Sequence, residues 1–251
     1  MNGITAIIPT YNEEANLASA IESVQFADEI LVIDSFSTDK TIEIAKSYGV
    51  RLIQHEYENS AAQKNRAIPM VTNEWIVLLD ADEVVTPALR EEIIAKVNSK
   101  PDEAGFWIQR SNDFMGRRIK YSGWQGDRVV RLFRKSFCRY EEKNVHAEVI
   151  ADGKLGYLKN RIHHNTFKGF DHYVTKVNRY AELQAKDFDT KTGKLTFYHF
   201  VLRPCFRFFK HYILKLGFLD GFPGFAISLF SGYAVFARYA KLWLLRNEKL
   251  K

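Results

Sequence analysis

The chain has 251 residues, of which 46% are hydrophobic and 26% charged, a balance typical of folded globular proteins that excludes a wholly disordered one. This length suits one large α/β domain or a domain with an appendage. The two cysteines, Cys138 and Cys205, lack metal-site spacing and are too few for a disulfide framework, so we expect free thiols in a reducing compartment.

The net charge of +6 is distributed unevenly along the chain. Residues 201–251 contain nine lysines and arginines against two acidic residues, a net charge of +7, so residues 1–200 sum to −1. A basic segment is one signature of nucleic-acid binding. The start of the chain lacks the basic region and cleavage site of a signal peptide, so we expect a protein in the cytosol or on the cytosolic face of a membrane.

The first hundred residues alternate between strand and helix patterns. Apolar runs predict four strands, at residues 3–9, 29–34, 50–54 and 74–80. Apolar residues at helical spacing predict a helix after each strand. The expected helix starts are Asn12, Thr38 or Asp39, Ser60 and Thr86-Pro87, and the second helix is expected to end at Gly49. This order predicts a largely parallel sheet covered on both faces.

The pattern changes after Pro101. Short strands without intervening helices are expected at residues 105–109, 117–120 and 129–134, as a smaller antiparallel or mixed sheet joined to the first. From Phe170 onward the apolar spacing is helical again.

Polar residues gather where the expected strands end, at residues 9–13, 34–39 and 80–83. In α/β sheets, ligands bind outside the carboxyl ends of the strands. Asp80 and Asp82 stand at i and i+2, a spacing that can aim both carboxylates the same way and hold Mg²⁺ or Mn²⁺ against a diphosphate. Ordinary turn and helix-cap chemistry is the alternative. No Gly-rich dinucleotide or Walker A motif follows the first strand, which disfavours nicotinamide and P-loop proteins.

Four motifs, in order along the chain, resemble those of the family 2 inverting glycosyltransferases, which have the GT-A fold. They are residues 8–14, 32–39, 63–67 and 79–83. Further segments are similar to the subgroup that adds a β-1,4-linked glucose to the inner core of bacterial lipopolysaccharide: Gly123-Trp124, Asp127, 131–134, 145–148 and 217–224.

The resemblance implies an α/β, GT-A architecture in three parts. Residues 1–100 would form a Rossmann-like nucleotide-sugar-binding half with a mainly parallel sheet. Residues 101–169 would form the acceptor and catalytic half, with a small mixed sheet. Residues 170–251 would form a helical, basic and aromatic region that associates with a membrane.

The resemblance also implies nucleotide-binding roles for Thr10, Glu13, Asp34, Lys64 and Asp80. Asp34 would accept a hydrogen bond from the uracil ring, which favours UDP, or would simply cap the following turn. Lys64, or Arg66 in its place, would contact the nucleotide, or both would lie on a solvated helix face. Asp80 would take the ribose side.

Catalytic roles follow from the same resemblance. Asp82 would bind the metal, and His146 would ligate it or touch phosphate unless it is structural. Inverting transfer needs one general base that removes a proton from the acceptor hydroxyl. Asp127 is the expected base and Glu148 the alternative.

Three other features remain open or are assigned structural roles. Arg131 would face phosphates, or Arg128, Arg131 and Arg134 would form one solvated strand face. Glu83 would support the metal site or add a charge near a helix start. His163 and His164 are expected to be structural, because adjacent residues on a strand point in opposite directions.

The basic segment contains twelve aromatic residues flanked by lysine and arginine. Its longest uncharged run, residues 221–237, is seventeen residues long and contains Pro223 and three glycines, whereas a spanning helix needs about twenty apolar residues. We therefore expect helices that lie in the membrane interface and favour anionic lipids. A packed helical subdomain or an oligomer interface is the alternative.

Together these features predict a metal-dependent glycosyltransferase that uses Mg²⁺ or Mn²⁺ to move a hexose, expected to be glucose from UDP-glucose, onto a membrane-held glycolipid such as the lipopolysaccharide core. It would be peripheral on the cytosolic face of the bacterial inner membrane, would not bind nucleic acid and would be free to oligomerise. A polyprenyl-phosphate, capsule or protein-glycan acceptor is the nearest alternative. A nucleotidyltransferase or a non-enzymatic membrane protein is a more distant one.

Overall fold

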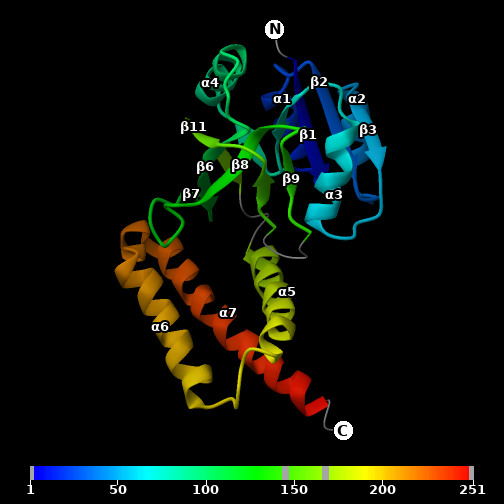
Figure 1. Cartoon of the computed structure of the whole chain (residues 1–251). Helices are drawn as coiled ribbons and strands as arrows, with labels where there is room; N and C mark the ends of the chain where they lie inside the picture. The colour runs from blue at the N-terminus through cyan, green and yellow to red at the C-terminus, as the bar shows by residue number, and fades with distance from the viewer. Residues whose placement is uncertain (1–2, 143–146, 166–169, 249–251) are drawn as a thin grey trace. The chain divides into compact units, whose positions relative to one another are not determined.

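The computed structural model describes residues 3–142, 147–165 and 170–248 (Figure 1). These residues form two compact units. Unit 1 comprises the described residues of 1–111 and 127–164, and unit 2 those of 112–126 and 165–251.

Unit 1 is built on a long mixed sheet, whose first four strands in chain order are parallel. Its parallel strands are β1 (Ile4–Thr10), β2 (Glu29–Asp34), β3 (Arg51–Gln54) and β4 (Trp75–Leu78). Antiparallel pairing extends the sheet through β8 (Arg128–Arg134), β6 (Gly105–Phe114), β11 (Leu155–Asn165) and β5 (Glu83–Val85). In the described part of the chain, the strand order is β3-β2-β1-β4-β8-β6-β11-β5.

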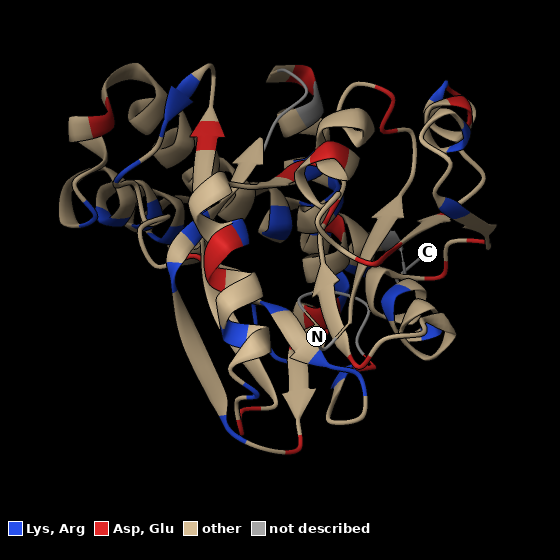
Figure 2. Ribbon diagram, turned by 90° about the horizontal axis from the view of Figure 1, so that it is seen from above, with Lys and Arg blue, Asp and Glu red and all other residues tan. Residues whose placement is uncertain are grey.

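Both faces of β1, β2 and β4 are largely buried, as their continuous apolar runs predict, whereas Arg51 and Gln54 at the two ends of the edge strand β3 are exposed. Side chains alternate along a strand, so Ala6 and Ile8 enter one hydrophobic cluster while Ile7 enters another. The helices of unit 1 are α1 (Leu17–Ser23), α2 (Thr41–Ser47), α3 (Ser60–Ala67) with its 3₁₀ extension η1 (Ile68–Met70), and α4 (Pro87–Asn98). Figure 2 shows the strands largely uncharged, with Lys, Arg, Asp and Glu mainly on helices and connecting segments.

Two of the predicted helix starts need correction. Asn12 does not cap α1, which begins at Leu17; Asn12 has φ 53° and its side-chain oxygen accepts a 2.8 Å hydrogen bond from the backbone N–H of Thr38. The N-cap position of α2 is Lys40, so neither Thr38 nor Asp39 occupies it; Asp39 does accept a 3.0 Å hydrogen bond from the backbone N–H of Thr41, the first residue of the helix. The start at Thr86-Pro87 is confirmed, since Thr86 accepts from the N–H of Leu89.

The second half of the sheet is more extensive than predicted. Strand β6 runs ten residues to Phe114, five beyond its predicted end. Strands β5, β9 (Cys138–Tyr140), β10 (Val149–Ala151) and β11 had no predicted counterpart. The mixed sheet is nevertheless joined to the parallel one, as expected, through the pairing of β8 with β4.

Unit 2 is mainly helical. Its helices are α5 (Phe170–Asp189), η2 (Tyr198–Leu202), α6 (Arg203–Phe209), η3 (Lys210–Leu214), η4 (Gly217–Asp220) and α7 (Gly221–Glu248). Helices α5 and α6 both pack against α7 (Figure 1). The short strand β7 (Arg117–Arg118) pairs with the end of β6.

The Asp220 carboxylate at the end of η4 holds the loop of residues 119–125 within unit 2. It accepts 3.0 Å hydrogen bonds from the backbone N–H groups of Lys120 and Tyr121, and a 2.7 Å bond from the hydroxyl of Ser122. The backbone carbonyl of Lys215 accepts a further 3.0 Å bond from the N–H of Ser122. The loop that leads to Asp127 is therefore tied to the C-terminal helices.

Helix α7 is continuous, contrary to the interruption expected at Pro223. Pro223 lies in its first turn, where the missing N–H has no helical partner to lose. Residues 217–247 are long and apolar enough to cross a membrane, with a mean hydropathy of 1.2 and 39% of the most apolar window buried in the fold. The core helix of a soluble protein can have the same length and composition, so these two properties alone do not distinguish a membrane span from a core helix.

Candidate active site

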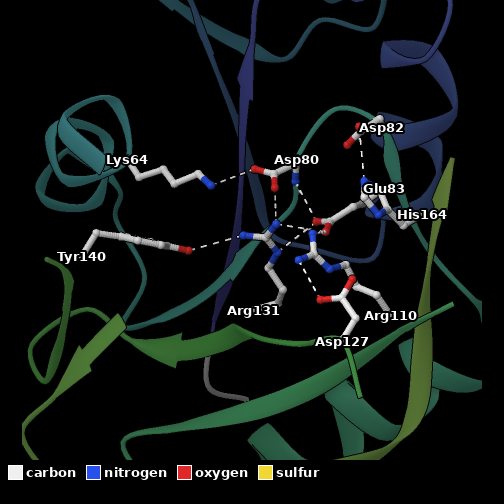
Figure 3. A network of polar contacts seen from close by, with 9 residues as sticks. All are labelled: Lys64, Asp80, Asp82, Glu83, Arg110, Asp127, Arg131, Tyr140 and His164. Atoms are coloured by element: carbon white, nitrogen blue, oxygen red, sulfur yellow. Dashed lines mark hydrogen bonds and ion pairs between the residues drawn. The ribbon is translucent and has the colours of Figure 1, made fainter. Parts of the chain in front are cut away.

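Oppositely charged side chains converge where β4 ends (Figure 3). Arg131 projects from β8 and contacts the carboxylates of Asp80, which follows β4, and Glu83, which begins β5. Its Nη2 and Nε lie 2.9 Å from Oε1 and Oε2 of Glu83. Arg131 is buried, so it does not lie on a solvated strand face. Glu83 is fully buried and holds the Arg131 guanidinium in position.

Lys64 is the second cation that contacts Asp80 in this network. Helix α3, which Asn59 caps, directs Lys64 inward, so this side chain is buried and not on a solvated face. Its Nζ lies 2.9 Å from Oδ1 of Asp80 and 5.1 Å from the centre of the Tyr140 ring. Arg66, by contrast, pairs with Glu58 at the surface.

The two cations keep Asp80 ionised. Burial alone would raise the pKa of its carboxyl, but the charges of Arg131 and Lys64 outweigh burial and hold the pKa far below its usual range. Asp80 therefore acts only as a hydrogen-bond acceptor and an anion.

Asp82 contacts His164, for which the sequence predicts only a structural role. Strand β11 pairs antiparallel with β5 and places His164 opposite Glu83. Its Nε2 lies 3.3 Å from Oδ2 of Asp82. His164 is buried, and its partner comes from 82 residues earlier in the chain.

Asp82 and His164 could together supply two ligands to a divalent cation. Carboxylate oxygen suits both Mg²⁺ and Mn²⁺, and an imidazole nitrogen is a ligand of transition metals, so a site that includes His164 suits Mn²⁺ better than Mg²⁺. Among the described residues, no group of three or more His, Cys, Asp or Glu side chains converges to hold a metal alone. A cation at this pair would therefore need further ligands from a phosphate group and water. The predicted metal ligand His146 lies outside the described residues.

Arg110 links the site to Asp127. Its Nη2 lies 3.0 Å from Oδ1 of Asp127, and its Nη1 lies 3.4 Å from Oε1 of Glu83. Asp127 precedes β8 and its side chain is 30% exposed, so solvent reaches it. The charges alternate along the chain of contacts that joins Lys64, Asp80, Arg131, Glu83, Arg110 and Asp127.

Glu148 is not brought into this network. It is exposed just before β10, and its backbone N–H donates to the Glu141 side chain over 3.3 Å.

Three of the predicted nucleotide-binding residues, Thr10, Glu13 and Asp34, lie at or just after the ends of β1 and β2. Thr10 and Asp34 are opposite each other in the parallel register, and both are buried. Asp34 accepts a 2.9 Å hydrogen bond from the N–H of Ser37 and a 3.1 Å bond from Gln54, which is the predicted turn-capping role. Its contact with a uracil ring stays a prediction.

The loops after β1 and β2 are tied to each other. The N–H of Asn12 donates to the Ser37 hydroxyl over 2.8 Å, and the N–H of Glu13 donates to the Thr41 hydroxyl over 2.8 Å. The hydroxyl of Thr10 has no hydrogen-bond partner within the described residues. The two loops are therefore held together by hydrogen bonds, and the Thr10 hydroxyl beside them is free to bind a ligand.

The fold is α/β, and the paired acidic and basic side chains at the carboxyl end of its parallel strands form a candidate ligand site. Residues 5–151 match the model of Glycosyl transferase family 2, and the chain belongs to this family. The fold is of the GT-A type, as the sequence predicted, and the protein is a transferase.

Relatives extend the similarity over almost the whole chain. An uncharacterized glycosyltransferase of Rickettsia typhi is 30% identical over 96% of this chain and 87% of its own length. The lipopolysaccharide core biosynthesis glycosyltransferase LpsC of Rhizobium meliloti is 27% identical over 96% of this chain and 92% of its own. The crystal structure of S. aureus TarS, residues 1–349, shares the fold, with a TM-score of 0.50, 13% identity, and coverage of 95% of this chain and 91% of that one.

Proposed function

We propose that this protein is an inverting glycosyltransferase that moves glucose from UDP-glucose onto a lipid-linked acceptor, the inner core of lipopolysaccharide. Family membership supplies the reaction class. The observation that carries the rest is the pairing of Asp82 with His164 beside the Asp80 network, at the sheet edge where α/β proteins bind ligands. Similarity to LpsC over 96% of the chain supports the acceptor class.

The two linked loops after β1 and β2 would bind the nucleotide. Thr10 offers an unused hydroxyl, Asp34 a carboxylate for the uracil ring, and Glu13 a further acceptor nearby. Asp80, held as an anion, would accept from the ribose hydroxyls, with Lys64 fixing its orientation.

Asp82 and His164 would hold the divalent cation, Mn²⁺ or Mg²⁺. The cation would supply the positive charge that neutralises the departing diphosphate. Glu83 and Arg131 would keep Asp80 and Asp82 in place, since both are buried and mutually paired beneath the site.

Asp127 would be the base that removes the proton from the acceptor hydroxyl as that oxygen attacks the anomeric carbon. Its ion pair with Arg110 supports this role, because the pair fixes the direction of a carboxylate that solvent reaches. Glu148 is the second candidate, and its exposed position outside the network makes it the weaker one.

Three regions of the chain would have different roles. Residues 1–100 would bind the donor, residues 101–169 would form the acceptor half, and residues 170–251 would attach the protein to the cytosolic face of the inner membrane. The long apolar α7 and the exposed aromatic residues of η2 and α6 support membrane attachment.

A donor and acceptor screen tests the proposal. Purified protein with Mn²⁺ or Mg²⁺ is offered UDP-glucose and other nucleotide sugars, with extracted lipopolysaccharide core or polyprenyl phosphate as acceptor, and product linkage is analysed. We expect β-linked glucose on the core acceptor. Transfer to polyprenyl phosphate alone would overturn the acceptor assignment.

Variants of the two candidate bases sharpen the test. We expect Asp127→Asn to lower turnover at least about a hundredfold, in line with the loss of a general base. Glu148→Gln and the exposed control Asp152→Asn are expected to retain it. Loss of turnover in Glu148→Gln alone would move the base to Glu148.

A further inference from the structure

Three arginines gather on unit 2, on helices α6 and α7. The guanidinium groups of Arg203 and Arg238 lie 5.6 Å and 4.8 Å from the centre of the same buried ring, Tyr239. Arg207 follows Arg203 by one helical turn and therefore shares its face. Burial lowers the pKa of Arg238, and the charges of Arg207 and Arg203 lower it further. These three residues form the arginine cluster: Arg203 and Arg238 lie against one ring, and Arg207 shares a helix face with Arg203.

No carboxylate neutralises the arginine cluster within the described part of the chain. Arg203 donates to the Tyr239 hydroxyl, and Arg238 donates to the Gln184 side chain over 3.2 Å. The Nε of Arg238 is buried and has no acceptor among the described residues.

Other cations of α7 do have carboxylate partners. Arg246 pairs with Asp189 at 2.8 Å, and Lys241 lies 3.7 Å from Glu182. The arginine cluster differs in this respect from Arg246 and Lys241, and its positive charge is not neutralised by a carboxylate among the described residues.

An exposed apolar stripe lies beside this charge. Helical segments η2, α6 and η3 follow each other without a break, and five of their large apolar side chains are spaced to share one face. These residues are 41–61% exposed: Tyr198, Leu202, Phe206, Phe209 and Ile213. Arg203, Arg207 and Lys210 occupy the neighbouring face, the arrangement of a helix that lies in a membrane interface.

We propose that Arg203, Arg207 and Arg238 bind the headgroup phosphate of an anionic phospholipid while the apolar stripe enters the lipid beside it. Guanidinium groups suit this ligand because their planar N–H forks bind phosphate oxygens in pairs. The apolar stripe selects a lipid surface over a soluble phosphate. The inference rests on the membrane attachment in the proposed function, and it adds which face of the protein and which lipid charge are used.

Vesicle flotation of the full-length protein tests this site. The probes are phosphatidylcholine vesicles with and without phosphatidylglycerol. We expect binding to favour the anionic vesicles, and Arg207→Gln, which alters an exposed side chain, to weaken that binding about fivefold. The double variant with Arg238→Gln is expected to weaken it roughly twentyfold.

The control variant is Lys46→Gln/Lys154→Gln, which removes the same charge from exposed positions of unit 1. We expect it to bind anionic vesicles like the wild type. Equal losses in the control and the arginine variants, or equal wild-type binding to both kinds of vesicle, would overturn the site.

Turnover separates this proposal from the proposed function. UDP release from UDP-glucose is measured on the same preparations, and we expect Arg207→Gln to match the wild type. A protein without any transferase turnover that still prefers anionic vesicles through the arginine cluster would defeat the proposed function and leave the lipid site standing.

Discussion

Arg131 is the residue on which the ion pairs of the site converge. It neutralises Glu83, which is fully buried and whose other cationic contact, Arg110, lies at 3.4 Å. Removing one partner of a buried ion pair leaves an uncompensated charge. We expect Arg131→Met to lower the free energy of unfolding by about 3 kcal/mol, measured by urea denaturation.

Arg128 provides a matched control for that variant. It lies on the same strand but is exposed and stacks on the Tyr157 ring at 5.6 Å. We expect Arg128→Met to change stability by less than about 1 kcal/mol. Equal losses in both variants would show that the Arg131 pair has no special role.

The ionisation of Asp80 makes the stability of the fold depend on pH in the acid range. Burial raises its pKa, but Arg131 and Lys64 lower it more, so the folded-state pKa lies below the ordinary value of 3.8. Its ionised form therefore stabilises the fold above that ordinary value, and this contribution is lost as the pH falls below it, because the unfolded chain binds the proton first.

We expect Asp80→Asn to be less stable than the wild type at pH 7, and the difference to shrink at pH 3. Urea denaturation at both pH values measures it. A difference of the same size at pH 3 would contradict the role of its ionisation.

The Asp82 and His164 pair predicts metal-dependent nucleotide binding. If both are ligands, His164→Ala should weaken UDP binding in Mn²⁺ by at least about tenfold, as measured by calorimetry, and leave metal-free binding unchanged. The adjacent His163→Ala is the natural control, since His163 points differently from the same strand. Similar losses in both variants would indicate a general disturbance of β11.

At the scale of elements, η4 fixes the loop that carries Trp124. Three donors of residues 120–122 share the Asp220 carboxylate. Asn at this position would replace one acceptor oxygen with a donor and leave N–H groups unpaired. Because this loop belongs to the proposed acceptor half, residues 101–169, we expect Asp220→Asn to raise the KM for the lipid acceptor several-fold while the KM for UDP-glucose stays constant.

Steady-state kinetics with each substrate varied in turn checks this expectation. Asp171→Asn, at an exposed position in the first turn of α5, should leave both KM values unchanged. A change confined to the donor KM in Asp220→Asn would place the loop in donor binding instead.

The sequence was informative where local pattern and burial agree. Strands β1, β2 and β4 are buried on both faces, so unbroken apolar runs marked them. The start of α4 was marked by a side-chain cap followed by proline, two signals that act within four residues.

It was uninformative where structure depends on distant pairing. Strand β11 has few buried positions and several charged ones, so it has no apolar run to mark it. Its pairing with β5 is what brings His164 to Asp82. The sequence left Arg131 either facing phosphates or on a solvated strand face with Arg128 and Arg134, because nothing local indicated that Glu83 would be buried beside it.

At the scale of the whole molecule, the candidate donor site belongs to one compact unit. Asp80, Asp82, Asp127 and His164 all lie in unit 1, although more than 80 residues separate the first from the last. Unit 2 has hydrophobic clusters of its own, around Phe114 and Tyr239. A ligand that binds only the folded form stabilises the part that binds it, by about 2.7 kcal/mol at a hundred times its Kd.

Tryptophan fluorescence can follow each unit separately, because the four tryptophans divide evenly between them. Trp75 and Trp107 belong to unit 1, and Trp124 and Trp243 to unit 2. In Trp124→Phe/Trp243→Phe, which reports on unit 1, we expect UDP with Mn²⁺ to raise the urea midpoint. In Trp75→Phe/Trp107→Phe, which reports on unit 2, we expect no shift. A shift of equal size in both reporters would mean that the units unfold as one cooperative block, and a shift in unit 2 alone would remove the donor site from the end of β4.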